Sequence, residues 1–266
     1  MLTFVDLFCG GGFGARGAVT AGARPLLAVD AWDLAADTYK SNFPDAEVIC
    51  SPIEKLKPKV LARRHSPDVL LTSPECTSHS IARGAKPKCE RSRETAIGII
   101  PWIEAMNPRW LIVENVNRMK QWERHNELIS TIKSYDYQVN DLLLNAANFG
   151  TPQSRKRMFL VCDRGGSVIT ADDLYRLHQR SEKTARSIID WSGNYKSTPL
   201  YKTGRAKATI ERAERAMTEL GRKKDFIIVY YGSDYAGGWQ SLDAPLRTIT
   251  TLDRFGLVTW QEILRF

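Results

Sequence analysis

The feature that most constrains the fold is an apolar strand near the N-terminus that runs directly into a turn of glycines. Residues 2–8 (LTFVDLF) are followed by Cys9-Gly10-Gly11-Gly12-Phe13-Gly14. Glycines allow the backbone to bend sharply and to approach a bound molecule, as happens at the carboxyl edge of parallel sheets. The turn therefore predicts an α/β fold with a ligand at the end of its first strand.

Apolar runs alternate with helical patterns over the first 165 residues. We expect strands at residues 2–8, 25–29, 46–50, 68–72, 110–113, 137–144 and 158–162, and helices at 15–22, 33–42, 93–106 and 123–134. Strands separated by helices favour a doubly wound, Rossmann-like α/β sheet that is mostly parallel and covered on both faces.

The pattern changes after residue 165. Helices are expected at 171–180 and 207–220, a strand at 225–231 and a glycine- and aromatic-rich loop at 235–240. We therefore divide the chain into a sheet domain at 1–165, a smaller domain at 166–240 and a segment at 241–266 that returns to the first domain.

The positive charge is concentrated in one stretch. The net charge is +8 at pH 7, and residues 154–224 hold 17 Lys and Arg against 8 Asp and Glu. A basic segment beside a near-neutral one favours a polyanionic partner, most simply nucleic acid. A solvated surface is the alternative for the same composition.

The cysteines and histidines argue against disulfides and metals. The five cysteines are odd in number and scattered, without a CxxC pair. The histidines do not group with them at zinc-ligand spacing. We expect no metal and a reducing cytoplasm. Cys9, Cys50 and Cys162 lie in or beside apolar strands, where burial is expected. No signal peptide is visible, and no apolar run approaches the ~18 residues of a membrane span.

Polar residues follow several of the expected strands. Asp30 lies 20 residues after Gly10, where a carboxylate can accept hydrogen bonds from ribose hydroxyls. Cys76 follows the fourth strand within Ser73-Pro74-Glu75-Cys76-Thr77-Ser78-His79-Ser80, and Glu114 ends the fifth. The carboxyl ends of parallel strands share one edge, so Cys76 and Glu114 are expected on the same side. An inert core cysteine and a surface strand end are the alternatives.

A basic motif, Gln153-Ser154-Arg155-Lys156-Arg157, enters the last strand of the first domain. Residues two apart in an extended chain share a face, so Arg155 and Arg157 are expected on one side. Guanidinium groups so placed can hold a phosphate or a base edge, or can lie in solvent at the start of a strand.

Together these motifs resemble the cytosine-C5 DNA methyltransferase family. The order DLFCGGG, Asp30, SPECTSHS, ENV and QSRKR matches the family from about residue 3 to 162, with a weaker echo at residues 245–258. The resemblance implies a methyltransferase variant of the doubly wound sheet that binds S-adenosylmethionine on the glycine turn. It also implies a basic target-recognition domain after the QxRxR motif, and most of the basic stretch lies there.

The resemblance assigns roles to particular residues. Cys76 attacks C6 of a flipped-out cytosine in duplex DNA, Glu114 protonates or hydrogen-bonds N3, and Arg157 is directed at O2 and at the glutamate. Arg155 steadies Cys76 or a nearby phosphate. Phe8 stacks on adenine and Asp30 holds the ribose. The full set implied for the cofactor is Phe8, Cys9, Gly10, Gly11, Gly12, Asp30, Ala31 and Ser51.

The sequence also departs from the family pattern. The family's usual Pro-Pro-Cys-Gln motif reads Pro-Glu-Cys-Thr here, and a carboxylate beside a thiol raises the thiol pKa. Ser51 stands where the family usually has an acidic residue. No Gly-Asn-x-Val segment precedes Phe266, which leaves three explanations open: truncation, a second polypeptide that completes the C-terminal part, or a shortened form.

Two other functions remain open at this level. One branch of the family methylates a cytosine in tRNA, so the substrate can be RNA. Alternatively, the chain is a DNA-binding subunit or remnant that is inactive without a partner chain. A restriction–modification setting agrees with the lead interpretation, DNA cytosine-C5 methylation.

Overall fold

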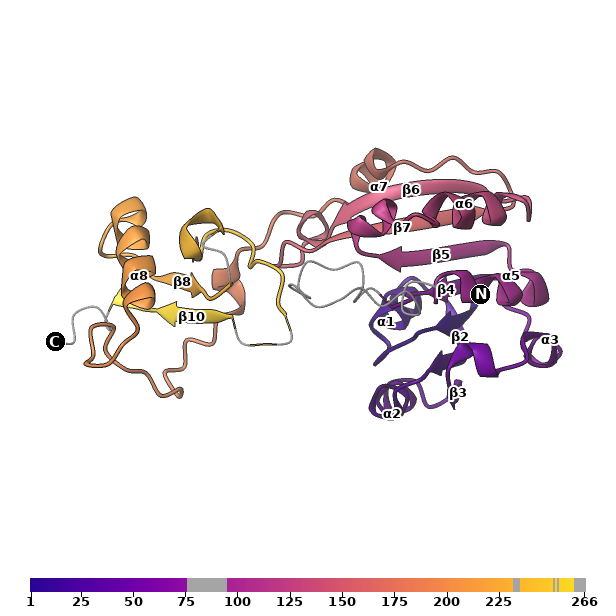
Figure 1. Ribbon diagram of the computed structural model, residues 1–266, viewed down its shortest axis with the longest axis horizontal. Coiled ribbons are helices and arrows are strands. Elements are labelled where there is room, and N and C mark those ends of the chain that lie inside the picture. Colours follow the sequence, from indigo (N-terminus) through magenta and orange to yellow (C-terminus); the bar gives the residue numbers. More distant parts are fainter. Residues whose placement is uncertain (76–94, 232–234, 251, 253, 261–266) are drawn as a thin grey trace. The chain divides into compact units, whose positions relative to one another are not determined.

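The computed structural model describes residues 1–75, 95–231, 235–250, 252 and 254–260. The described chain forms two compact units. The first unit comprises Met1–Leu144 and Lys156–Leu174, and the second comprises Asn145–Arg155 and Tyr175–Phe266. Each unit has its own sheet and its own core (Figure 1).

The first unit contains the sheet expected from the sequence. Its strands are β1 (Thr3–Leu7), β2 (Arg24–Asp30), β3 (Glu47–Cys50), β4 (Val69–Thr72), β5 (Trp110–Asn115), β6 (Gln138–Asn145) and β7 (Lys156–Asp163). Within the described residues their order is β3-β2-β1-β4-β5-β7-β6. The pairs from β3 to β5 are parallel, whereas β7 runs antiparallel to β5. The mostly parallel, doubly wound architecture is confirmed.

Helices accompany these strands. They are α1 (Phe13–Thr20), α2 (Asp33–Asn42), α3 (Pro58–Leu61), α5 (Ile100–Met106), α6 (His125–Lys133) and the short 3-10 turns η1 (Ile53–Lys55), η3 (Ile97–Ile99) and η4 (Asn117–Gln121). The 3-10 turn η5 (Ala146–Phe149) follows β6 and belongs to the second unit. Residues 93 and 94 of the expected helix at 93–106 lie outside the described residues. The described part contains the 3-10 turn η3 followed by α5, because Pro101 lacks the N–H needed within a longer helix and fits its first turn.

Alternate residues of β1 build the cores on the two faces of the sheet. Val5 and Leu7 pack in a cluster with Trp102 and Ile103 of α5, whereas Phe4 packs in another with Tyr39 of α2. Successive side chains of a strand point to opposite faces, so an apolar run is needed to bury both. Asp6 lies between these apolar positions and is itself buried.

The second unit has a smaller antiparallel sheet. Its elements are η6 (Ala185–Ile188), α8 (Lys207–Leu220), β8 (Phe226–Val229), η7 (Tyr235–Gly238), β9 (Trp239–Ser241) and β10 (Phe255–Val258), and α7 (Ala171–His178) runs across the boundary between the units. The described strands are ordered β10-β8-β9. Phe226 and Ile228 pack against α8, which lies beside the sheet (Figure 1).

The structure differs from the expectations in three places. The stretch 235–240 contains η7 and most of β9, where we expected a loop. Among the described residues after 241, none belongs to the first sheet, since β10 pairs with β8. The strand β8 is central in the second sheet, with β10 on one edge and β9 on the other, and all four of its residues are buried. Cys50 is exposed, because it ends β3 at the edge of the first sheet.

Two features are absent from the described residues. No helix among them is long and apolar enough to cross a membrane. The described residues also contain no group of three or more His, Cys, Asp or Glu side chains that could hold a metal ion.

Candidate active site

The glycine turn between β1 and α1 has a left-handed backbone. Phe8, Gly10 and Gly12 have φ angles of 57°, 51° and 88°. A Cβ on Gly12 would lie 2.5 Å from the ring of Phe43, so only glycine fits there. A Cβ on Gly10 would meet nothing within 4 Å, so the surface of the turn at this residue is open.

Asp30 ties this turn to the end of β2. Its Oδ2 accepts the backbone N–H of Gly10 at 2.8 Å, and its Oδ1 accepts that of Trp32 at 2.9 Å. The carbonyl of Asp30 accepts the N–H of Ser51 at 2.8 Å, and Ala31 is exposed. Each carboxylate oxygen has a second lone-pair direction, so Asp30 can accept further hydrogen bonds from a ligand.

A second carboxyl group, Asp6, is buried near this turn. Its side chain is 4% exposed, and its Oδ2 has no hydrogen-bond partner among the described residues. Burial, with a smaller contribution from the charge of Asp30, raises the pKa of Asp6 to about 8. The sequence analysis did not single out Asp6, although a carboxylate inside an apolar strand was the available signal.

Burial also raises the pKa of the Cys9 thiol, with smaller contributions from the charges of Asp6 and Asp30. A thiol must ionise to act as a nucleophile. Cys9 is therefore part of the apolar packing beneath the turn. Cys162 in β7 belongs to the other core cluster of this unit, and burial raises its pKa to about 12.

The ends of β1, β4 and β5 are joined by side-chain hydrogen bonds. Ser73, just after β4, donates from Oγ to the carbonyl of Phe8 at 2.9 Å. Asn115, the last residue of β5, donates from Nδ2 to the carbonyl of Pro74 at 3.1 Å. These two contacts fix the backbone that leads toward Cys76, and Cys76 itself lies outside the described residues. The sequence analysis gave Ser73 and Asn115 no role, although both belong to the quoted motifs.

Glu114 and Arg157 form an ion pair at the same edge. The distance from Arg157 Nε to Glu114 Oε1 is 3.0 Å, and the two side chains are 18% and 32% exposed, respectively. The antiparallel register sets this contact, because Glu114 lies opposite Phe159 and Arg157, two residues before Phe159, shares its face of the sheet. The carboxylate of Glu114 is thus oriented by a partly buried guanidinium group.

Arg155 belongs to the second unit. Its backbone N–H donates to Asn145 Oδ1 at 2.9 Å, and its carbonyl accepts the N–H of Ala146 at 3.1 Å. The strand β7 begins at the next residue, Lys156. The role of the Arg155 side chain stays a prediction.

These observations define a class of protein. Within the first unit, a glycine turn clamped by an acidic residue and an arginine-bound glutamate lie at the carboxyl ends of parallel strands in one sheet. Such a sheet, with its antiparallel β7, is a doubly wound methyltransferase fold.

Comparison with known proteins identifies the family. The profile of the C-5 cytosine-specific DNA methylase family matches residues 2–254. The Type II methyltransferase M.HgiDI of Herpetosiphon aurantiacus is 30% identical over 250 residues, which is 92% of this chain and 79% of that protein. The chain belongs to the C-5 cytosine-specific DNA methylase family.

More distant relatives include an RNA enzyme. The human tRNA (cytosine(38)-C(5))-methyltransferase is 29% identical over 142 residues, or 52% of this chain and 36% of that enzyme. The solved structure of the S. pombe Dnmt2 methyltransferase has a TM-score of 0.62 at 15% identity, covering 91% of this chain and 83% of that one. This chain spans 40 to 51% of three further Type II methyltransferases.

Proposed function

We propose that this chain methylates C5 of cytosine in duplex DNA and uses S-adenosylmethionine as the methyl donor. The observation that carries the proposal is the ion pair between Glu114 and Arg157. It lies at the carboxyl edge of the sheet to which the glycine turn and the Ser73-Pro74 segment also belong. Family membership supports the same chemistry.

The residues of the glycine turn fit the proposed cofactor. The open surface at Gly10 admits a ligand close to the backbone, and Asp30 retains acceptor capacity for ribose hydroxyls. Phe8 would stack on the adenine, and Cys9, Gly11, Gly12, Ala31 and Ser51 would complete the surroundings. When bound, S-adenosylmethionine supplies an electrophilic methyl group on a sulfonium centre.

The chain's own residues would activate the cytosine. C5 is a poor nucleophile, so the Cys76 thiolate would form a bond to C6 and make C5 enamine-like. Glu114 would donate a proton or hydrogen bond to N3, where charge develops, and Arg157 would orient that carboxyl group. After methylation, transfer of the C5 proton to solvent and cleavage of the S–C6 bond would release 5-methylcytosine and restore the Cys76 thiolate. Any proton taken up at N3 would return to Glu114.

A base inside a duplex is out of reach of Cys76, so the cytosine must be flipped out, at a cost of a few kcal/mol. Binding of the rest of the DNA has to offset this cost. We assign that task to the second domain of the sequence division, residues 166–240, as the target-recognition domain. Its positive charge suits the phosphate backbone, and Arg155 would steady Cys76 or contact a nearby phosphate.

A covalent trapping experiment tests the proposal. The protein is incubated with S-adenosylmethionine and randomised duplex DNA that contains 5-fluorocytosine, which cannot lose its C5 substituent as a proton. We expect a protein–DNA band that survives denaturation, requires the cofactor and disappears in Cys76→Ala. DNA binding that persists in Cys76→Ala separates chemistry from recognition. Methyl transfer by Cys76→Ala would refute the covalent mechanism.

A tRNA cytosine is the second candidate substrate, because the human tRNA enzyme matches about half of this chain. A competition assay decides between the two. Trapping on the 5-fluorocytosine duplex is measured with increasing unlabelled duplex DNA or unlabelled tRNA at equal nucleotide concentration. We expect the duplex to compete at least tenfold better, and preferential competition by tRNA would assign the activity to RNA.

A further inference from the structure

The second unit contains a cavity that the proposed catalytic chemistry does not use. Its volume is about 920 Å³, and it lies among the loop at residues 190–200, the start of α8 and the strands β8 and β10. Cavities that hold small ligands have volumes of ~300–1,000 Å³. Aromatic side chains contribute much of the lining: Trp191, Tyr195, Tyr230 and Trp260.

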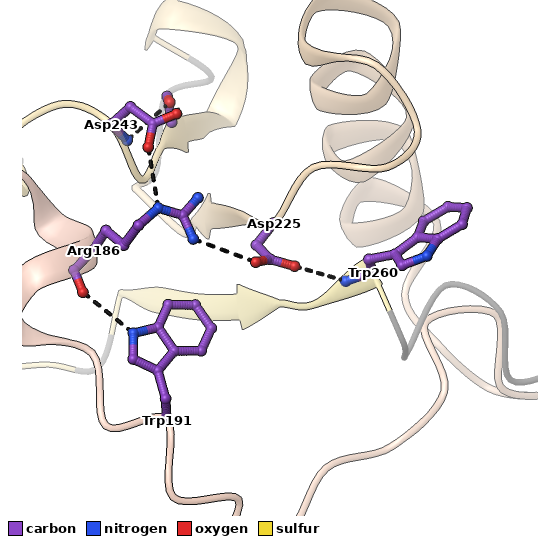
Figure 2. Close-up of polar contacts among 6 residues, drawn as sticks. Arg186, Trp191, Asp225, Asp243 and Trp260 are labelled. Carbon is purple, nitrogen blue, oxygen red and sulfur yellow. Dashed lines mark hydrogen bonds and ion pairs between the residues drawn. The ribbon is translucent and has the colours of Figure 1, made fainter.

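Trp191 and Trp260 are both held by one network of polar contacts, shown in Figure 2. Arg186 donates to Asp243 Oδ1 at 3.1 Å and to Asp225 Oδ2 at 3.5 Å. Asp225 Oδ1 in turn accepts the backbone N–H of Trp260 at 2.9 Å. Trp191 donates from its indole nitrogen to the Arg186 carbonyl at 3.3 Å, and the Arg186 guanidinium lies 5.7 Å from its ring centroid.

The loop that carries Trp191 and Tyr195 is also fixed at its far end. Arg205 donates to Thr198 Oγ1 at 2.7 Å and to the carbonyls of Pro199 and Leu200 at 2.8 and 3.2 Å. The loop between η6 and α8 has no helix or strand of its own in the described chain. These contacts therefore hold the aromatic wall in place while Tyr195 stays 73% and Trp191 47% exposed.

The acidic side chains that line the cavity have partners within the protein, whereas two of its lysines do not. Asp225 is bound by Arg186 and Trp260, and Asp190 accepts the backbone N–H of Ser192 at 2.8 Å. Lys196 and Lys223 also line the cavity, and neither makes an ion pair or side-chain hydrogen bond within the described part of the chain. The cavity therefore combines exposed aromatic rings with two available ammonium groups, which is the chemistry that recognises a nucleotide.

We propose that this cavity binds an unstacked nucleobase of the DNA, held against Trp191 and Tyr195, with an adjacent phosphate on Lys196 and Lys223. The inference rests on the proposed function, since it assumes DNA as the partner, and it assigns to the second unit a base contact separate from the target cytosine. Every base has a π face, so this contact tolerates many sequences.

Photocrosslinking tests the proposal with the full chain. The probe is randomised duplex DNA with 5-iodo-2′-deoxyuridine in place of thymidine, which links to aromatic side chains in contact with the base upon near-ultraviolet irradiation. Trypsin cleavage after Arg186 and Lys196 releases the peptide 187–196, which contains both Trp191 and Tyr195. We expect mass spectrometry to find the DNA adduct on this peptide.

Variants measured by fluorescence anisotropy with the unmodified duplex give a second readout. Tyr195→Ala truncates a largely exposed ring, and we expect affinity to fall about tenfold, in line with loss of one base stack. Tyr201→Ala is the matched control, since Tyr201 is 40% exposed in the same loop and does not line the cavity, and its affinity should stay within twofold. Lys196→Gln combined with Lys223→Gln removes the contacts to one phosphate and should lower the slope of log K against log salt by about 0.9.

Methyl transfer measured on the same DNA distinguishes this inference from the proposed function. Adducts only outside peptide 187–196, or unchanged binding by Tyr195→Ala, would overturn the inference, and continued methyl transfer would leave the proposed function intact. An adduct on that peptide without methyl transfer would support the inference and contradict the proposed function. A chain that binds no DNA would overturn both.

Discussion

Replacement of Asp6 by Asn should change the pH dependence of stability in a direction fixed by the structure. Asp6 is 4% exposed, and its pKa is raised from 3.8 to about 8, first by burial and then by the charge of Asp30. Near neutral pH the folded chain therefore keeps a proton that the unfolded chain has released. An asparagine at this position stays neutral in both states.

The sign and size of the effect follow from proton linkage. Below about pH 4 Asp6 is protonated in both states and contributes no pH dependence. As the pH rises from about 4 toward about 8, the unfolded state loses its proton first, and stability falls by about 1.4 kcal/mol per pH unit. Above about pH 8 both states are ionised, and the loss of stability stops.

Asp6→Asn should abolish this decline, so its free energy of unfolding relative to the native chain should increase by about 3 kcal/mol between about pH 5 and about pH 7. The new amide N–H group lies where Oδ2 has no partner among the described residues, which costs about 1–3 kcal/mol at every pH. The prediction therefore concerns how the difference in free energy of unfolding between Asp6→Asn and the native chain changes with pH. The absolute size of that difference at any one pH does not test it.

The assay is urea unfolding followed by far-ultraviolet circular dichroism at four or more pH values. Asp37→Asn, an exposed carboxyl group on α2, is the matched control for the removal of one negative charge. Its free energies should run parallel to those of the native chain. Parallel curves for Asp6→Asn would refute the assignment of a protonated Asp6 at neutral pH.

Three further predictions concern the active site. Glu114→Gln should lower methyl transfer by about 10²–10⁴-fold while DNA binding in the anisotropy assay stays within twofold, because N3 loses its proton donor; a rate within threefold of the native chain would contradict the role. Asp30→Asn should weaken S-adenosylmethionine binding by at least about tenfold in calorimetry, since one charged acceptor of the glycine turn is lost, and unchanged affinity would place the cofactor elsewhere. Gly12→Ala should destabilise the chain by about 1–3 kcal/mol in thermal unfolding, because Gly12 has a positive φ and a Cβ there would clash with Phe43. Gly14→Ala in α1 is the control: open space surrounds its Cβ, so the substitution should be neutral or stabilising.

The sequence predicted elements best where local signals agreed with the fold. The bounds of α2 and α8 were predicted residue for residue. In α8, strong helix formers fill the segment and Gly221 follows its last residue. The sequence did not predict the strand β9, because three residues that follow two glycines are too few to show an alternation of apolar and polar side chains. Its formation depends on pairing with β8.

The site shows the same division. Strand ends are visible in the sequence, so the strand pattern alone predicts Asp30 and Glu114 at the edge of the sheet. The burial of Asp6 and the bond from Asn115 to Pro74 depend on which elements pack together, and no local pattern encodes them. Cys50 was misjudged for the same reason, because an apolar run does not reveal that β3 is an edge strand.

The division of the chain has a consequence for exchange of parts between relatives. The second unit is discontinuous, since residues 145–155 belong to it although they lie between β6 and β7 of the first sheet. Ser154 donates its backbone N–H to the Leu246 carbonyl at 2.7 Å and accepts the Thr248 hydroxyl at 2.9 Å. A graft of the segment from residue 175 onward alone would lose these native partners. Recombination that transplants this unit intact must therefore carry both pieces, so the inheritable module is two stretches of gene rather than one.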